Sequence, residues 1–239
     1  MTFNGISLVK TKQFASSRTV GNPIQVARVY NSRNVDELVF IDIKATEQNR
    51  KINLLLVKKV IDECFMPVTI GGGIQTFEDI NDLLHIGADK VLIKTIALED
   101  PDFIVKAVKY FGSQCISIAV DVIFENGEYW IHQKNDEKLL MDNFIKKMNA
   151  CNVGEFVVNA VHNDGMMSGY DLGLYEKVTQ LTSKPIVAIG GAGTPSHFTE
   201  LISTNYNGAL AAASIYHFTQ YTPQEVKKTL NKAQIPVRI

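Results

Sequence analysis

Two glycine clusters stand where apolar, strand-sized segments of the sequence end. Gly72 and Gly73 follow one such segment, and Gly190 and Gly191 follow another. Because glycine lacks a Cβ, backbone N–H groups in such a turn can approach an oxyanion closely and cradle a phosphate. The alternative is that these glycines serve only the tight turns that join strands to helices. The occurrence of two clusters in matching positions favours two phosphate sites.

A small hydroxyl residue closes the strand that follows each glycine cluster. These residues are Thr95, after VLIK, and Ser214, after LAAA. We predict a first cradle made by Gly72, Gly73, Lys94 and Thr95, and a second made by Gly165, Gly190, Gly191, Ala213 and Ser214. Two equivalent cradles on opposite sides of one mouth would suit a long substrate that carries a phosphate at each end.

Two aspartates also stand at strand ends and are candidate catalytic groups. Asp121 ends the segment CISIAVD, and Asp164 lies in the loop sequence HNDG. A carboxylate at such a place can act as a general acid or base, or it can cap a helix or shape a turn. We interpret Asp121 as catalytic, while for Asp164, which precedes a glycine, both interpretations stay open.

The histidines and cysteines do not form a metal-binding pattern. The five histidines show no HxH or HExxH spacing, and only His162 falls in a strand-end loop, so we expect the others to be surface or packing residues. The three cysteines, Cys64, Cys115 and Cys151, are widely spaced without a CxxC pair. We therefore expect no metal and no cofactor, and free thiols in a reducing cytoplasm.

Composition and patterning describe the scaffold that must position these residues. The chain has 239 residues, of which 46% are hydrophobic, which suits one large core. A net charge of −1 does not favour a nucleic-acid partner, and no apolar segment is long enough to span a membrane. The first residues do not resemble a signal peptide.

Short apolar segments alternate with amphipathic ones along the whole chain. The predicted strands are 38–43, 68–70, 90–94, 116–122, 156–160, 186–189 and 209–213. The predicted helices include 23–31, 51–64, 76–86, 102–111 and 142–150. Strands that are apolar throughout are typical of parallel sheets covered on both faces, so the alternation predicts an α/β protein.

An internal repeat sets the number of units. VDELVFIDI, starting at Val35, matches VGEFVVNAV, starting at Val153, at an offset of 118. The glycine clusters and the pair Thr95 and Ser214 match at an offset of 119. We predict one domain, residues 1–239, folded as a (β/α)8 TIM barrel from two similar half-barrels, about 1–118 and 119–239. In such a barrel the site lies at the carboxyl ends of the strands.

The motifs resemble those of the HisF family, the cyclase subunit of imidazole glycerol phosphate synthase, along nearly the whole chain. They include GNP, DELVFIDI, GGGI, GADKV, NDGMMSGYD, GGAG and AAASIYHF. The resemblance implies a lyase of histidine biosynthesis whose HisH-like glutaminase partner makes ammonia that crosses the barrel. It also assigns roles to a lysine of the mobile first loop, Lys10, to an ammonia gate of Glu37, Lys90 and Glu155, and to partner-facing Asp89 and Gln114.

The sequence departs from that family at the first strand. The family uses two aspartates, one ending the first strand and one ending the fifth, where Asp121 matches. The repeat offset of 119 puts Thr2 in the first place, and no acidic residue precedes Asp36. The first strand is therefore truncated, and we expect the natural chain to begin upstream of Met1. Lys94 also replaces a usual asparagine, Ile189 replaces a serine, and the arginine of the gate is absent.

Two other functions stay open at this point. LVKT and DECFMPVTIGGGI also resemble the WbuZ-like glycosyl-amidation branch, which does not keep the first-strand aspartate and works with a sugar amidotransferase. The protein would then deliver ammonia for amidino sugars of a surface polysaccharide. The remaining alternative is a phosphate-ligand-binding subunit without catalytic activity.

Overall fold

The computed structural model of the chain describes residues 1–133 and 137–238. Its strands are β1 (Thr2–Phe3), β2 (Leu8–Thr11), β3 (Ser17–Gly21), β4 (Leu38–Asp42), β5 (Val68–Gly71), β6 (Lys90–Ile93), β7 (Ile116–Glu125), β8 (Glu128–Ile131), β9 (Glu155–Ala160), β10 (Ile186–Ile189) and β11 (Ala209–Leu210). Its helices are α1 (Pro23–Ser32), α2 (Leu54–Ile61), α3 (Phe77–His85), α4 (Thr95–Glu99), α5 (Pro101–Phe111), the 3-10 helix η1 (Ser113–Cys115), α6 (Met141–Ala150), α7 (Leu172–Leu181), α8 (Pro195–Ser203), α9 (Ser214–Phe218) and α10 (Pro223–Lys232).

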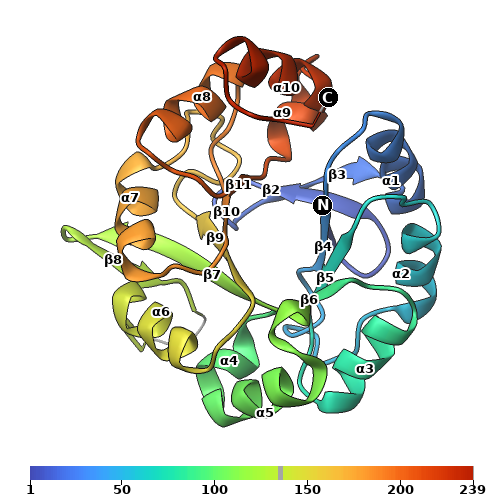
Figure 1. The fold of residues 1–239 in the computed structure, drawn as a ribbon. Coiled ribbons are helices and arrows are strands. Elements are labelled where there is room, and N and C mark those ends of the chain that lie inside the picture. Colours follow the sequence, from blue (N-terminus) through green and yellow to red (C-terminus); the bar gives the residue numbers. More distant parts are fainter. Residues whose placement is uncertain (134–136, 239) are drawn as a thin grey trace.

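The parallel strands follow one another round a curled sheet in the order β1, β4, β5, β6, β7, β9, β10, β11. The helices form a ring outside these strands, so each strand is followed by a helix that returns the chain to the other end (Figure 1). This is the predicted (β/α)8 barrel. The first strand is short, as predicted, because β1 holds only two residues whereas its counterpart β7 holds ten.

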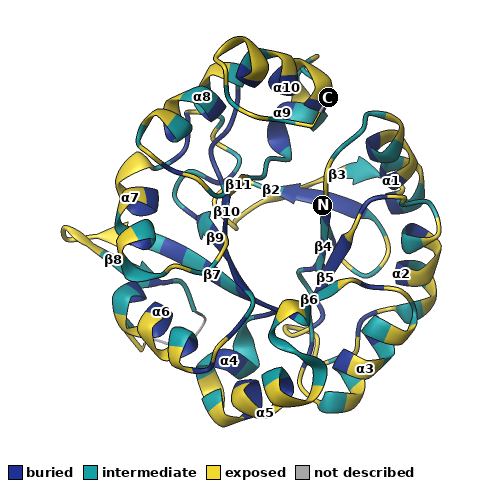
Figure 2. Cartoon of the chain, in the orientation of Figure 1, coloured by how far each residue is buried: buried dark blue, intermediate teal, exposed yellow. Residues whose placement is uncertain are grey.

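The parallel strands β5, β6 and β9 are mostly buried, because helices cover the outside of the sheet (Figure 2). All four residues of β5 are buried, which explains why that segment is apolar instead of alternating. On β1 the ring of Phe3 stacks on that of Phe40, with ring centroids 4.2 Å apart. Complete burial of one such side chain contributes about 1.5–3 kcal/mol, so the short β1 is nevertheless anchored in the core.

The helices begin where the sequence supplies capping groups and bury one face each. At α3 the hydroxyl of Thr76 accepts from the N–H of Asp79, and the carboxylate of Asp79 accepts from the N–H of Thr76. Ile80 and Leu83 are the buried residues of this helix and lie on one side of it. No helix within the described residues is long and apolar enough to cross a membrane.

Two antiparallel units interrupt the repeating pattern, and the sequence analysis did not predict them. In the first, β2 pairs with both β1 and β3, and the second is the hairpin of β7 and β8. The turn of the second is Asn126–Gly127, with φ of 52° and 83°, as a two-residue type I′ turn requires. Asparagine followed by glycine is the sequence signal for such a hairpin.

The pairing register bears out the internal repeat. Thr2 in β1 pairs with Ile41 in β4, and Asp121 in β7 pairs with Asn159 in β9. The two pairs are related by the same offsets, 119 and 118, that the sequence motifs show. Thr2 therefore occupies the place in the first half-barrel that Asp121 occupies in the second.

Candidate functional site

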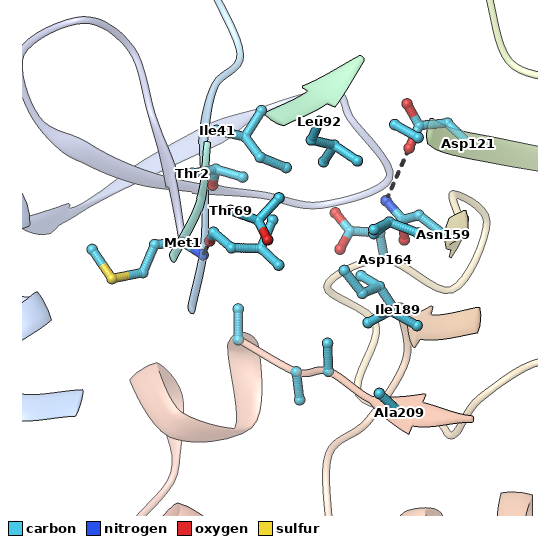
Figure 3. Close-up of a pocket in the computed structure, with 18 of the residues that line it drawn as sticks. Met1, Thr2, Ile41, Thr69, Leu92, Asp121, Asn159, Asp164, Ile189 and Ala209 are labelled. Carbon is cyan, nitrogen blue, oxygen red and sulfur yellow. Dashed lines mark hydrogen bonds between the residues drawn. The ribbon is translucent and has the colours of Figure 1, made fainter. Parts of the chain in front are cut away.

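A cavity of about 1490 Å³ opens at the carboxyl ends of the parallel strands and runs into the barrel. Side chains from both half-barrels line it, among them Thr2, Leu92, Asp121, Asn159 and Ile189 (Figure 3). All the residues predicted to form the phosphate cradles also line it: Gly72, Gly73, Lys94, Thr95, Gly165, Gly190, Gly191, Ala213 and Ser214. The fold thus brings both predicted cradles to a single mouth.

The two cradles share their backbone conformation. Gly72 has φ of 111° and its counterpart Gly191 has φ of 102°, a left-handed conformation that favours glycine. Lys94 and Ala213, the N-cap residues of α4 and α9, have φ of −130° and −133°. Because β5 and β6 lie halfway round the sheet from β10 and β11, the cradles face each other across the mouth.

The backbone conformation that Gly72 and Gly191 share also has a purely structural cause. A Cβ on Gly72 would collide with the backbone carbonyl of Asp42, and one on Gly191 would collide with that of Gly169. The turns therefore need glycine whether or not a phosphate binds. Replacing Gly72 or Gly191 by a larger residue would therefore disturb the loop itself. A loss of ligand binding in such a variant would not show that the glycine contacts the ligand.

Ser214 supplies an observation that points to a ligand. Its side chain is buried, lines the mouth, and its Oγ has no hydrogen-bond partner within the described part of the chain. A buried hydroxyl without a partner costs about 1–3 kcal/mol of desolvation, so such a group usually bonds to protein, to ordered water or to a bound molecule. A phosphate oxygen in the second cradle would satisfy it.

Asp121 is held at the mouth by two side chains from neighbouring strands. Its Oδ2 accepts from Lys94 Nζ at 2.6 Å, and its Oδ1 accepts from Asn159 Nδ2 at 3.5 Å, the bond drawn in Figure 3. The side chains of Lys94 and Asp121 are 26% and 17% exposed, so the ion pair is only partly solvated. The predicted phosphate ligand Lys94 thus contacts the predicted catalytic carboxylate.

His132 also lines the mouth, although the sequence analysis treated it as a surface or packing residue. The β7–β8 hairpin returns it to Asp121, whose carbonyl accepts from the His132 N–H at 2.8 Å. Burial, and next the positive charge of Lys94, lower the pKa of this imidazole below its usual value. It is therefore neutral near pH 7 and adds no charge to the site.

Lys10 and Asp164 form a buried ion pair that joins the two halves at the mouth. Lys10 Nζ donates to both carboxylate oxygens of Asp164, at 2.6 and 2.8 Å. The hydroxyl of Thr11 donates to the same carboxylate at 3.3 Å, and the N–H of Gln13 donates to the Asp164 carbonyl at 2.9 Å. Asp164 is therefore more than a turn residue, because it holds the β2–β3 hairpin over the mouth.

His162 lies on the strand-end loop where the sequence placed it, but it contacts a carboxylate outside the cavity. Its Nε2 lies 2.8 Å from Asp171 Oδ2, and the hydroxyl of Tyr129 donates to Asp171 Oδ1 at 3.0 Å. Burial opposes ionisation of Asp171, yet these bonds and that from the Leu174 N–H bring its pKa below the usual value. Asp171 thus ties the loop to the β7–β8 hairpin and caps α7.

The predicted gate residues meet at the amino-terminal end of the barrel. Lys90 Nζ lies 2.8 Å from Glu155 and 3.2 Å from Glu37, and the hydroxyl of Ser117 donates to Glu155 at 2.7 Å. Burial works against the charge of Lys90, but the two carboxylates raise its pKa above the usual value. Glu37 and Glu155 also line the cavity, which therefore extends from the mouth to these charges.

The two predicted partner-facing residues lie near the same end and are both exposed. Asp89 accepts from the N–H of Val68 at 2.7 Å and so supports the start of β5. Gln114 lies in η1, immediately before β7. Both residues therefore sit on the face that begins the strands, opposite the mouth.

Comparison with known proteins agrees with this architecture. The model of the family described as histidine biosynthesis protein matches residues 4–222. The chain belongs to that family. Among its relatives, the imidazole glycerol phosphate synthase subunit HisF of Exiguobacterium sp. is 40% identical over 97% of this chain and 91% of its own length. The HisF proteins of Thermococcus onnurineus and Staphylococcus saprophyticus are 38% and 36% identical over 97% of this chain and 93% and 94% of their lengths.

Membership of the HisF family gives the register at β1 its significance. The family motifs predict an aspartate at the end of the first strand. The pairing of Thr2 with Ile41 shows that a threonine stands at that position in this chain. Its hydroxyl donates to the carbonyl of Val9 and so serves the β1–β2 hairpin. Thr2 lines the cavity but offers no ionisable group there.

Proposed function

We propose that this protein is the cyclase subunit of an imidazole glycerol phosphate synthase. The substrate would carry a phosphate at each end, and the ammonia would come from a HisH-like glutaminase. The observation that carries this proposal is the pair of cradles with matching backbone conformations on opposite sides of one mouth, with Asp121 between them.

The first phosphate would be held by Gly72, Gly73 and Thr95, and the second by Gly165, Gly190, Gly191, Ala213 and Ser214. Binding at both ends places the middle of the substrate over Asp121, which is positioned to move protons there as a general acid or base. Lys10 and Asp164 would keep the β2–β3 hairpin over the bound substrate. No group of three or more His, Cys, Asp and Glu side chains in the described ranges could hold a metal ion.

The other end of the barrel supports the proposed partner. Glu37, Lys90 and Glu155 form a charged cluster at the amino-terminal end of the cavity, where ammonia would have to enter to reach the mouth. The exposed Asp89 and Gln114 lie on that face and would contact the glutaminase. The alternative of sugar amidation is not favoured, because the three relatives compared are all HisF subunits.

The test is turnover of the substrate of imidazole glycerol phosphate synthase with ammonium salt in place of the partner. The wild-type protein should form product, and Asp121→Asn should lower kcat by about 10²–10⁴-fold because it removes a proton-transferring group. Asp62→Asn makes the same chemical change at the exposed end of α2 and serves as the matched control. With glutamine instead of ammonium, turnover should require an added HisH-type glutaminase.

Two results would overturn the proposal. One is the absence of ammonium-dependent product from wild-type protein that is folded and binds the substrate. The other is an Asp121→Asn protein that is as active as the Asp62→Asn control.

A further inference from the structure

The two boundaries between the half-barrels differ in the side chains that they present to the mouth. At the boundary of β6 and β7, Lys94 follows the first strand and Asp121 lies on the second. At the other boundary, between β11 and β1, the corresponding residues are Ala213 and Thr2. The repeat therefore supplied two equivalent places for an acid–base pair, and only one of them holds ionisable side chains.

The geometry of this boundary couples Lys94 to Asp121 directly. Strands β6 and β7 pair in parallel, with Ile93 opposite Ile118, so the chain beyond Ile93 lies beside the part of β7 that leads to Asp121. Lys94 Nζ is then 2.6 Å from Asp121 Oδ2, and both side chains line the cavity. The nearby His132 is neutral near pH 7, since burial and Lys94 lower its pKa. Within the part of the chain that the structure describes, Lys94 is thus the cation that contacts Asp121 at the mouth.

We propose that Lys94 is the general acid of this site and Asp121 its general base. The inference rests on the function proposed above. It names Lys94 as the residue that takes the role of the first-strand aspartate, whose position Thr2 occupies in this chain. It gives Lys94 a role in proton transfer instead of phosphate binding, because its ammonium donates to Asp121 beside the place where the middle of the substrate would lie.

The proton balance of ammonia addition fits this pair. As the nitrogen of ammonia bonds to a carbonyl carbon of the substrate, the C=O π electrons move to the oxygen. Asp121 takes one proton from the nitrogen, and Lys94 gives one proton to the oxygen. Transfer from the Asp121 carboxyl group to the Lys94 amine, over the 2.6 Å between them, then restores both groups.

Loss of water repeats the same two transfers. Lys94 protonates the hydroxyl group, the C–O bond breaks and water leaves, while the nitrogen lone pair forms the C=N bond and Asp121 takes the second N–H proton. The sum is ammonia plus carbonyl giving imine plus water, and no oxidant or further reactant is needed. The ammonia is that of the proposed function, and the carbonyl is the group that this inference places in the middle of the substrate.

The experiment compares Lys94→Gln and Lys94→Arg in the ammonium-dependent assay, with Lys109→Gln on the exposed face of α5 as control. Both Lys94 variants keep a hydrogen-bond donor for Asp121, but a neutral amide and a guanidinium cannot release a proton near pH 7. Urea unfolding of each variant shows that it is folded. Both should lose about 100-fold or more in kcat, with KM changed less than threefold, while Lys109→Gln stays at the wild-type value.

Each other outcome has a distinct meaning. If Lys94→Arg is as active as wild type while Lys94→Gln is not, Lys94 only positions Asp121, and the acid role is wrong. If KM rises while kcat is unchanged, Lys94 binds a phosphate, and the acid role is again wrong. If wild type itself shows no turnover, the proposed function fails and the acid role fails with it.

Discussion

The boundary between β6 and β7 and the boundary between β11 and β1 share a backbone but not a chemistry. Lys94 and Ala213 have nearly equal φ, and Asp121 and Thr2 have the same register against their neighbours. Yet one boundary carries an ion pair and the other carries a methyl group and a hydroxyl. The backbone is constrained by the sheet and its turns, whereas side chains that face an open cavity are free to differ.

The glycine turns illustrate the constrained part of this comparison. Gly72 and Gly191 keep the same left-handed conformation because a Cβ at either place would meet a backbone carbonyl. At Lys94 and Ala213 the backbone conformations are also alike, but the side chains differ. The two halves therefore have the same backbone conformation where close packing requires glycine. They differ in the side chains that face the cavity.

The largest expected effect comes from separating the halves at the mouth. Lys10→Met leaves the buried carboxylate of Asp164 without its cation and should lower the free energy of unfolding by about 3–5 kcal/mol. Lys58→Met breaks the exposed pair with Asp62 on α2 and should cost about 0–1 kcal/mol. Urea unfolding measures both. Equal losses in the two variants would mean that the Lys10–Asp164 pair does not join the halves as described.

A smaller effect tests whether the cradles are equivalent. Thr95→Ala and Ser214→Ala should each raise KM for the two-phosphate substrate about 10-fold or more, because a hydrogen bond to a charged group contributes about 1.5–3 kcal/mol. The kcat should change less than threefold. Ser203→Ala, at the exposed end of α8, is the control. A rise in only one of the two cradle variants would show that a single phosphate is bound.

The smallest effect concerns α9 and α4, where His217 in the second half corresponds to Leu98 in the first. Burial, with a further contribution from nearby positive charge, lowers the pKa of His217 from 6.5 to about 4. Between these values the unfolded chain binds a proton that the folded chain excludes. Stability is therefore fully present above about pH 6.5 and falls by about 1–3 kcal/mol as the pH drops towards 4.

His217→Leu, which copies the residue of the first half, should flatten this pH dependence. Urea unfolding at several pH values between 4 and 7.5 gives the free energy of unfolding of wild type and variant. The difference between the two proteins removes the contribution of the carboxylates that they share. His85→Gln, at the exposed end of α3, is the control. Parallel curves for wild type and His217→Leu would contradict the assignment to His217.

Much of the fold could be predicted because the relevant signals are local. The seven predicted strands all exist. The offset between the halves reappears in the strand register, where Thr2 pairs with Ile41 and Asp121 pairs with Asn159. The hairpins were harder to predict. The strand β3 is largely exposed and β8 is short and mixed in polarity, so neither forms an apolar run, and only Asn126–Gly127 marked the second hairpin.

The sequence by itself determined the barrel, its two halves, and the placing of Gly72, Gly191, Thr95 and Ser214 at one end, because burial and turn chemistry act over a few residues. Only the tertiary structure decided which side chains meet. Lys94 reaches Asp121 because β6 lies beside β7, and His132 reaches the same mouth because a hairpin reverses the chain. Such contacts depend on the register between strands and on packing across the barrel, which no local pattern encodes.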